Sequence, residues 1–374
     1  MAKKALVIGG GFAGCSAANL LAGKKGWEVT LVERDTRLGG GNKTSWWGGH
    51  PHTFGPRHFI TRDEKIWGYL TSMLEMRRCP EHICLSYIES EQAFYNYPIH
   101  VDDIPLMSKK DQINEELANA KKNFDTPPKN LEEYWQQSIG NTMYDMFVNT
   151  YSKKMWQVHD NKAIDDFGWS PKGVALKTGP REVWDDAISA VPNGIDGYDP
   201  FFARATTEVK VMCNTEITRW DIPAKKVFYN DEWHEFDVVI NTISPDILFD
   251  FCYGQLKYVG RDLHLFVLPV EHVFPENVYF LYYPNGEKFT RLIEYKKFTR
   301  FQSPTSLLSM EIPSTKGRYY PMPISTEYAI AKRYFAEMPE DVFSIGRAGS
   351  YLYKIDIDDA IGQAMEVTDA ILNG

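Results

Sequence analysis

The chain of 374 residues has little cysteine, no long apolar run and no excess of basic charge. Its five cysteines are an odd and scattered set, which suits a reducing cytoplasm better than a disulfide framework. No stretch reaches the roughly 18 apolar residues that a membrane span needs. The apolar run after the first lysines is too short for the core of a signal peptide. We therefore expect a soluble cytoplasmic protein without a membrane span.

Acidic residues outnumber basic ones, with 50 Asp and Glu against 41 Lys and Arg and a net charge of −9. This balance argues against a surface that binds nucleic acid, so any phosphate group has to be held locally. The 43% hydrophobic and 14% aromatic content is enough to bury a sizeable core. Internal repeats and low-complexity linkers are also lacking, which predicts closely packed domains built from discontinuous segments.

A strand, a glycine-rich turn and a helix are predicted at the start of the chain. Residues 4–8 form the strand, residues 12–21 the helix and residues 28–32 a second strand, which predicts a βαβ unit. Gly9-Gly10-Gly11-Phe12-Ala13-Gly14 fits G-x-G-x-x-G, whose glycines allow a tight turn and let a pyrophosphate approach the helix N-terminus. A turn without a ligand is the alternative, but the register of strand, helix and Glu33 favours a bound dinucleotide.

Glu33 ends the second strand. Its carboxylate can accept hydrogen bonds from an adenosine ribose and would repel a 2′-phosphate, which favours FAD or NAD over NADP. The next residues, R-D-T-R-L-G-G at 34–40, resemble the E-x-x-x-x-x-G-G extension of FAD-binding amine oxidases and favour FAD. The candidate cofactor-binding residues of this region are Gly9, Gly11, Phe12, Ala13, Gly14, Glu33, Arg34, Gly40, Gly41 and Asn42.

Helices and strands alternate along the rest of the chain. Helical periodicity covers residues 63–76 and 131–156, the second stretch with Asn130 as its N-cap, and returns at 359–372. Short aromatic and aliphatic runs between residues 253 and 309, broken by Pro, Asn and Gly, indicate antiparallel strands. Further strands are predicted at 208–212, 226–229, 236–241 and 341–345.

Five segments in order resemble UDP-galactopyranose mutases. The family typically has N-L-E-E, then G, then Y-T-x-K-Q-W in its helical nucleotide-binding region, and this chain has N-L-E-E at 130–133, Gly140 and Y-S-K-K-M-W at 151–156. The other matching segments are F-G-P-R-H-F at 54–59, F-T-R-L-I-E-Y-K-K-F at 289–298, R-Y-Y-P at 318–321 and G-R-A-G-S-Y-L-Y at 346–353. The resemblance therefore spans almost the whole chain.

This resemblance implies an α/β fold in three parts. The expected Rossmann-like FAD-binding domain comprises residues 1–62, 195–250 and 335–374. An inserted helical domain is expected at 63–158, and a twisted antiparallel β-sheet domain with a mobile loop at 159–194 and 251–334. Dimers are usual in the resembled bacterial enzymes, so a homodimer is the expected assembly.

The resemblance also implies an isomerase that interconverts pyranose and furanose forms of a nucleotide-linked hexose, either UDP-galactose or a modified relative. In the family, N5 of reduced FAD attacks the anomeric carbon while the nucleoside diphosphate leaves and later returns. NAD(P)H is the expected external reductant, without a second Rossmann site dedicated to it, because the sequence has only one dinucleotide fingerprint. The product would supply furanose for surface polysaccharide.

Family motifs place the candidate site residues. Arg291, Tyr320 and Tyr353 match residues that contact the diphosphate, since arginine forks fit phosphate oxygens. Arg57, His58 and Arg347 match positions beside the flavin, where a positive charge would stabilise the reduced anionic form. Tyr151 and Trp156 match the uracil-binding segment, although such an aromatic pair alone would indicate core packing. His100 and Arg181 complete the candidate substrate-binding residues.

Three departures from the family pattern concern the same pocket. Arg57 replaces the first His of the family's G-P-H-I-F-H, and His58 follows one place later. Pro98-Ile99-His100 stands where the family has P-x-N-L. Residues 185–194 lack the mobile-loop arginine, for which Arg181 is the candidate replacement. We therefore expect a substrate related to, but different from, UDP-galactose.

The same residues leave two other functions open. An FAD-dependent oxidase or dehydrogenase of the amine-oxidase-like class shares the cofactor motif, and a non-catalytic nucleotide-sugar binding protein would explain the missing loop arginine. No metal site is expected, because His50, His52 and His58 are irregularly spaced and Cys79 and Cys84 lack two further ligands.

Overall fold

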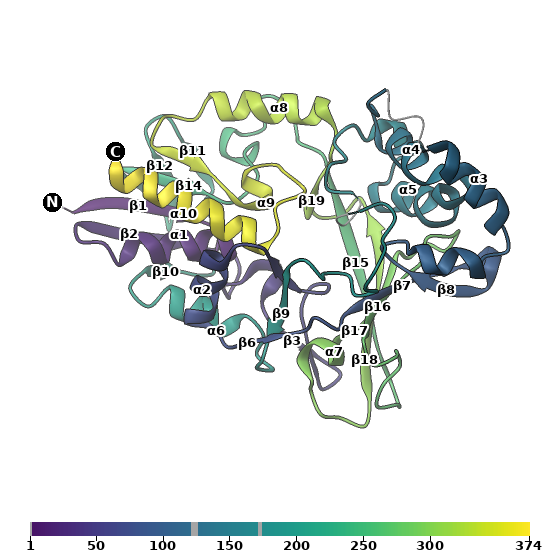
Figure 1. The fold of residues 1–374 in the computed structure, drawn as a ribbon. Coiled ribbons are helices and arrows are strands. Elements are labelled where there is room, and N and C mark those ends of the chain that lie inside the picture. Colours follow the sequence, from purple (N-terminus) through teal and green to yellow (C-terminus); the bar gives the residue numbers. More distant parts are fainter. Residues whose placement is uncertain (1, 121–125, 171–173) are drawn as a thin grey trace.

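The computed structural model describes residues 2–120, 126–170 and 174–374. One of its two large units is organised around a parallel sheet in the order β10-β2-β1-β14-β20 (Figure 1). The five strands come from distant parts of the chain: β1 (Lys3–Ile8), β2 (Trp27–Val32), β10 (Lys210–Met212), β14 (Val238–Asn241) and β20 (Val342–Ser344). This confirms the predicted Rossmann-like domain and its assembly from discontinuous segments.

Alternating side chains of β1 bury the two faces of this sheet in different layers. Ala5 and Val7 pack against α1 (Phe12–Ala22) and α10 (Ile357–Asn373), whereas Leu6 and Ile8 face a small antiparallel sheet. That sheet consists of β11 (Arg219–Asp221), β12 (Lys226–Tyr229) and β13 (Glu232–Glu235). The glycine-rich turn between β1 and α1 therefore lies at the carboxyl end of a central strand, where ligands of such sheets bind.

The second large unit is a seven-stranded sheet in the order β19-β15-β18-β17-β16-β7-β8, with one parallel pair, β16 and β7. It confirms the predicted antiparallel region after residue 253. Its strands are β7 (Ile83–Ile88), β8 (Ala93–Asn96), β15 (Tyr258–Leu268), β16 (Val278–Tyr282), β17 (Arg291–Glu294), β18 (Ser306–Ser314) and β19 (Tyr320–Pro321). Strands β7 and β8 fall inside the stretch 63–158 that we expected to form the helical domain, so this stretch is shared between helices and sheet.

The inserted helices pack at the side of this sheet (Figure 1). They are α3 (Lys110–Ala120), α4 (Leu131–Tyr144), a π-helical turn (Asp145–Asn149) and α5 (Thr150–Trp156). Asn130 caps α4 as predicted, since its side chain accepts a hydrogen bond from the Glu133 amide at 3.0 Å. The predicted continuous helix 131–156 is instead interrupted at Gly140, whose φ of 80° is not helical.

The segment expected as a mobile loop contains a strand. β9 (Ile188–Pro192) is the central strand between β5 (Phe59–Thr61) and β6 (Met76–Arg78). The remaining elements are β3 (Ser45–Trp47), β4 (His50–His52), α2 (Glu64–Met73), α6 (Asp199–Ala205), α7 (Tyr295–Thr299), α8 (Ser325–Ala336), α9 (Gly346–Gly349) and the 3₁₀ turns Gly40–Asn42, Glu89–Glu91, Val101–Leu106, Asn161–Ala163 and Ile247–Phe249.

The described residues include neither a membrane-spanning helix nor a cluster of metal ligands. None of the helices in the described ranges combines the length and the apolar character of a membrane span. In the same part of the chain, no three His, Cys, Asp or Glu side chains gather in a way that could hold a metal ion.

Candidate functional site

A cavity of about 490 Å³ lies where the three parts of the chain meet. Segments from the Rossmann-like part, the inserted helices and the large sheet all contribute to its wall. Its polar and aromatic lining residues include Arg57, His58, Arg62, Tyr97, Phe147, Tyr151, Trp169, Trp184, Arg261, Phe280, Tyr282, Arg291, Glu311, Tyr320, Arg347, Tyr353 and Asp356. Arginines outnumber carboxylates in this wall although the whole chain is acidic, which is the local basic environment that a phosphate ligand requires.

The glycine-rich turn is shaped by close backbone contacts. A Cβ on Gly14 would lie 2.0 Å from the carbonyl oxygen of Gly9, so only glycine lets α1 approach β1 this closely. A Cβ on Gly11 would have no atom within 4 Å. The side chain of Phe12 is buried against Tyr198, so its backbone alone remains for a ligand at the turn.

Residues 39–42 lie against this turn. The amide of Gly39 donates to the carbonyl of Gly10 at 2.7 Å, and a Cβ on Gly40 would lie 3.9 Å from the Cα of Gly11. Asn42 Oδ1 is buried and has no hydrogen-bond partner among the described residues. A buried acceptor without a donor indicates that this segment is shaped for a polar ligand.

Glu33 projects from the end of β2 over the same turn. Its carboxylate accepts hydrogen bonds from the amides of Gly10 and Asp35, each at 2.7 Å. Each carboxylate oxygen retains a lone pair for a further donor, such as a ribose hydroxyl. Arg34 turns away, because its side chain is 80% exposed and its nearest acidic partner is Glu216 at 3.9 Å.

Two arginines connect the turn with the cavity. Arg57 Nε donates to the carbonyl of Gly41 at 3.1 Å, and Arg347 Nε donates to the carbonyl of Ile355 at 2.7 Å. Both line the cavity, and the guanidinium of Arg347 lies 5.4 Å from the ring centre of Tyr320. These contacts place two fixed cations between the dinucleotide turn and the rest of the cavity.

Arg291 forms a buried ion pair with Glu311. Arg291 Nη2 lies 2.6 Å from Glu311 Oε2, and the Glu311 side chain is 3% exposed. Burial lowers the pKa of Arg291, but Glu311 and the neighbouring tyrosines together outweigh it and raise this pKa well above its ordinary value. The two residues face each other on the paired strands β17 and β18, which fixes the guanidinium in the cavity wall.

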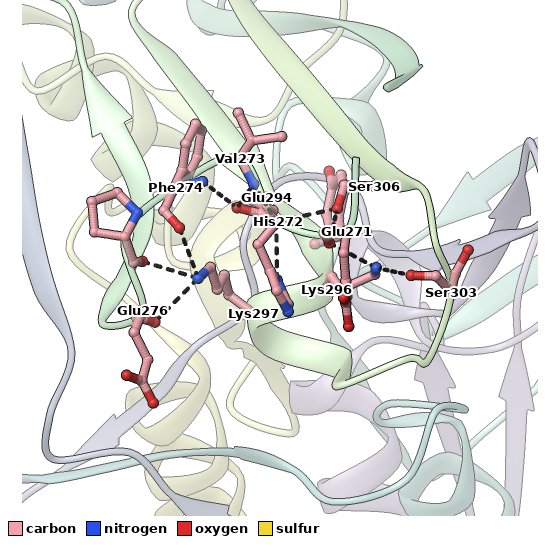
Figure 2. A network of polar contacts seen from close by, with 12 residues as sticks. Glu271, His272, Val273, Phe274, Glu276, Glu294, Lys296, Lys297, Ser303 and Ser306 are labelled. Atoms are coloured by element: carbon pink, nitrogen blue, oxygen red, sulfur yellow. Dashed lines mark hydrogen bonds and ion pairs between the residues drawn. The ribbon is translucent and has the colours of Figure 1, made fainter. Parts of the chain in front are cut away.

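A polar network anchors the other end of β17 (Figure 2). Glu294 is fully buried and accepts hydrogen bonds from the amides of Val273 and Phe274, the latter at 2.8 Å. Lys297 Nζ donates to the carbonyls of Phe274 and Pro275 at 3.0 and 2.9 Å. This network holds the loop after β15 against the strand that carries Arg291, so the position of Arg291 does not depend on a flexible segment.

Three tyrosines line the cavity together with Arg291. Tyr320 and Tyr353 have ring centres 5.6 Å apart, and Tyr151 approaches from α5 with its ring 5.7 Å from that of Tyr282. Burial, and then the neighbouring Tyr320, raises the pKa of Tyr353 to about 12. Its hydroxyl therefore stays protonated at neutral pH and can donate a hydrogen bond to an anion.

His58 also lines the cavity, and its Nε2 is directed toward the sheet of β5, β9 and β6. This nitrogen lies 2.8 Å from Ser189 Oγ and 3.1 Å from Cys79 Sγ. Burial raises the pKa of Cys79 to about 11, which keeps the thiol protonated. The contacts fix the ring plane of His58 in the wall of the cavity.

Three candidate substrate-binding residues do not line the cavity. His100 is fully buried and bonds the carbonyl of Gly179 at 3.0 Å, and Arg181 pairs with Asp103 at 2.7 Å. Trp156 packs behind the wall, with its ring centre 4.7 Å from that of Tyr353. In this structure these three residues are therefore not placed to contact a ligand in the cavity, because other protein groups already contact their polar atoms or ring faces.

Other lining residues were not singled out from the sequence. Arg261, Trp169, Trp184, Tyr282 and Glu311 lie in no quoted motif. For Glu311 a signal existed, namely a charged residue inside a largely apolar strand segment, which is unusual unless it is paired or functional. Arg261 had no such signal, because Asp262 and His264 make its own segment polar. The tryptophans and Tyr282 had no such signal, because aromatic residues are common throughout these strands.

The N-terminus of α10 predicts a pH dependence of stability. Burial, and then the nearby Asp359 and Asp356, raises the pKa of Asp358 to about 6. The folded state therefore holds this proton more tightly than the unfolded state, whose Asp pKa is near 3.9, and stability is lost as the pH rises from about 4 to 6. Asp358→Asn should match the wild type at pH 4 and be more stable by about 2 kcal/mol at pH 7. Urea unfolding at both pH values tests this, and an equal difference at both would contradict it.

Comparison with known proteins identifies the family. The family model described as UDP-galactopyranose mutase matches residues 146–353, more than half of the chain, and the model of an NAD(P)-binding Rossmann-like domain matches residues 7–73. The chain is 23% identical to the probable UDP-galactopyranose mutase of Klebsiella pneumoniae, covering 99% of this chain and 95% of that protein. It is 22% identical to the dTDP-fucopyranose mutase of Escherichia coli, covering 97% of each.

Solved structures agree in fold. A reduced UDP-galactopyranose mutase superposes with a TM-score of 0.83 at 16% identity, covering 100% of this chain and 94% of that one. A redesigned putrescine oxidase superposes with a TM-score of 0.66 at 13% identity, covering 99% of each. The matched region of the family model contains Tyr151, Arg291, Tyr320, Arg347 and Tyr353, all of which line the cavity. The chain therefore belongs to the UDP-galactopyranose mutase family, a family of isomerases.

Proposed function

We propose that this protein is a flavin-dependent mutase that interconverts pyranose and furanose forms of a nucleotide-linked hexose. The observation that carries the proposal is one cavity that Arg291, Tyr320, Tyr353 and Tyr151 share with Arg57, whose side chain donates to Gly41 beside the dinucleotide turn. The relatives are named for a UDP-sugar and a dTDP-sugar, so both nucleotides are candidate substrates. The furanose product would feed a glycosyl transfer reaction, as in the assembly of a surface polysaccharide.

The residues present fit FAD. The close approach at Gly14, the open position at Gly11 and the first amides of α1 suit a pyrophosphate, and the Glu33 carboxylate suits the ribose. Asn42 Oδ1 offers a buried acceptor beside the turn. Arg57 and Arg347 continue from there into the cavity and would lie near the flavin ring.

Different side chains act on different parts of the substrate. Reduced flavin supplies the nucleophile for the anomeric carbon. Arg291 stabilises the negative charge that develops on the diphosphate as the glycosidic C–O bond breaks, and its pairing with Glu311 keeps it oriented for that task. The hydroxyls of Tyr320 and Tyr353 donate to the same phosphate oxygens, and Tyr151 offers a ring face for the base. NAD(P)H is the proposed reductant.

Turnover under reducing conditions tests this function. Purified protein should show a flavin spectrum, and after reduction with dithionite it should convert UDP-galactose, dTDP-fucose or a modified hexose nucleotide into a product of unchanged mass. Chromatography separates the ring isomers. Flavin binding without isomerisation of any such sugar would overturn the proposal.

An oxidase is the second candidate, because the fold is shared with a putrescine oxidase. An oxidase would consume oxygen stoichiometrically with its substrate, whereas a mutase needs only catalytic reductant. The arginines facing the cavity favour a diphosphate ligand over an amine, since they would repel a cationic amine.

A further inference from the structure

Arg261 is a buried cation of the cavity to which no role has been assigned above. It lies on β15, is 5% exposed, and is the most buried arginine of the described residues. Its Nη1 donates to the carbonyl of Gly260 at 2.7 Å and reaches that of Met155 at 3.5 Å. Its guanidinium carbon lies 4.7 Å from the ring centre of Tyr320, which belongs to the diphosphate end of the cavity.

The charge of Arg261 has no ionic partner within the described ranges. No carboxylate there lies within 4.0 Å of its guanidinium, whereas Arg291 has Glu311 at 2.6 Å and Arg347 has Asp356 at 3.6 Å. The carbonyl of Met155, in the last turn of α5, offers only the partial negative charge of a helix C-terminus. Burying an unpaired cation is costly, so its presence in a cavity wall indicates that an anion binds there.

Resting on the proposed function, we infer that Arg261 binds the diphosphate of the substrate and takes the place of a loop arginine. Residues 185–194 contain no arginine, and β9 within them is the central strand of a sheet. Arg181 is engaged with Asp103 and lies outside the cavity lining. Because Arg291 and Glu311 together carry no net charge, Arg261 supplies the net positive charge at this end of the cavity.

A fixed strand position has a consequence for binding. β15 pairs with β18 over nine residues, from Gly260 to Leu268, so Arg261 is held next to the strand that carries Glu311. A Cβ on Gly260 would lie 1.5 Å from the carbonyl of Lys316, which shows how closely the backbone is packed here. The diphosphate should therefore be recognised without closure of an arginine-bearing loop.

Equilibrium binding of UDP and dTDP, compared with uridine and thymidine, tests the inference. Quenching of tryptophan fluorescence can report it, because Trp169 and Trp184 line the cavity. Arg261→Met keeps an unbranched apolar stem but removes the charged guanidinium. We expect it to weaken diphosphate binding by about 30-fold or more and nucleoside binding by less than about threefold.

Two further variants make the result decisive. Arg261→Lys keeps the charge without the fork and should lose about fivefold in diphosphate affinity, and it serves alone if Arg261→Met does not fold. Arg181→Met should leave the diphosphate affinity within about twofold. Unchanged diphosphate binding in the Arg261 variants, equal losses for diphosphate and nucleoside, or a larger loss in Arg181→Met would each overturn the inference. A wild-type protein that binds neither diphosphate would instead remove the proposed function itself.

Discussion

Replacing Arg291 by alanine is expected to lower kcat/KM for the nucleotide sugar by at least about 100-fold. Arg291 on β17 is held by Glu311 on β18, so its loss removes a preorganised charge from the leaving diphosphate. The same change leaves the carboxylate of Glu311 buried without its cation. We therefore also expect the free energy of unfolding to fall by about 3–5 kcal/mol. Steady-state kinetics of the reduced enzyme and urea unfolding measure the two effects.

The double variant Arg291→Ala, Glu311→Ala separates these effects. Removing both partners of a buried ion pair leaves no unpaired charge, so most of the lost stability should return. Activity should not return, because the diphosphate still lacks its guanidinium. A double variant as unstable as Arg291→Ala would show that Glu311 is not the cause of the instability, and recovered activity would contradict the role of Arg291.

The parts of the fold that the sequence predicted are those set by local rules. The G-x-G-x-x-G turn, Glu33 and the Asn130 cap depend on spacing within one or two neighbouring elements, and the structure places each of them as predicted. The helical stretch 63–158 was less accurate. Strand β7 within it pairs with β16, almost 200 residues later, and no local pattern signals a partner so distant.

The candidate site shows the same division. Arg291 and Tyr353 were found from motifs and do line the cavity. Arg181 and His100 were chosen by their position relative to the family pattern, but tertiary contacts with Asp103 and Gly179 occupy them. Arg261 could not be found by spacing, because its importance lies in the absence of a nearby carboxylate in three dimensions. The pairing of charges is decided by tertiary structure, which the order of residues does not reveal.

Gly14→Ala and Gly11→Ala should differ in their effect on folding stability although the two residues share one turn. A Cβ at position 14 would lie 2.0 Å from the carbonyl of Gly9 and 3.2 Å from Val7 Cγ1, so α1 must move away from β1. We expect flavin-free Gly14→Ala to lose about 3 kcal/mol of unfolding free energy, which exceeds the gain of up to about 1 kcal/mol in helix propensity. Its flavin content should fall as well, because the turn is displaced.

Gly11→Ala tests the cofactor alone. Gly11 has an ordinary extended conformation with φ of −82°, and its Cβ would meet no atom within 4 Å, so the unfolding free energy should change by less than about 0.5 kcal/mol. The added methyl group would nevertheless occupy the approach of the pyrophosphate to α1, and flavin affinity should fall by at least about tenfold. Urea unfolding of the flavin-free variants and flavin titration separate the two effects. A Gly11→Ala protein that binds flavin like the wild type would mean that the cofactor does not cross this turn, whereas a stability loss equal to that of Gly14→Ala would mean that position 11 is also needed for packing.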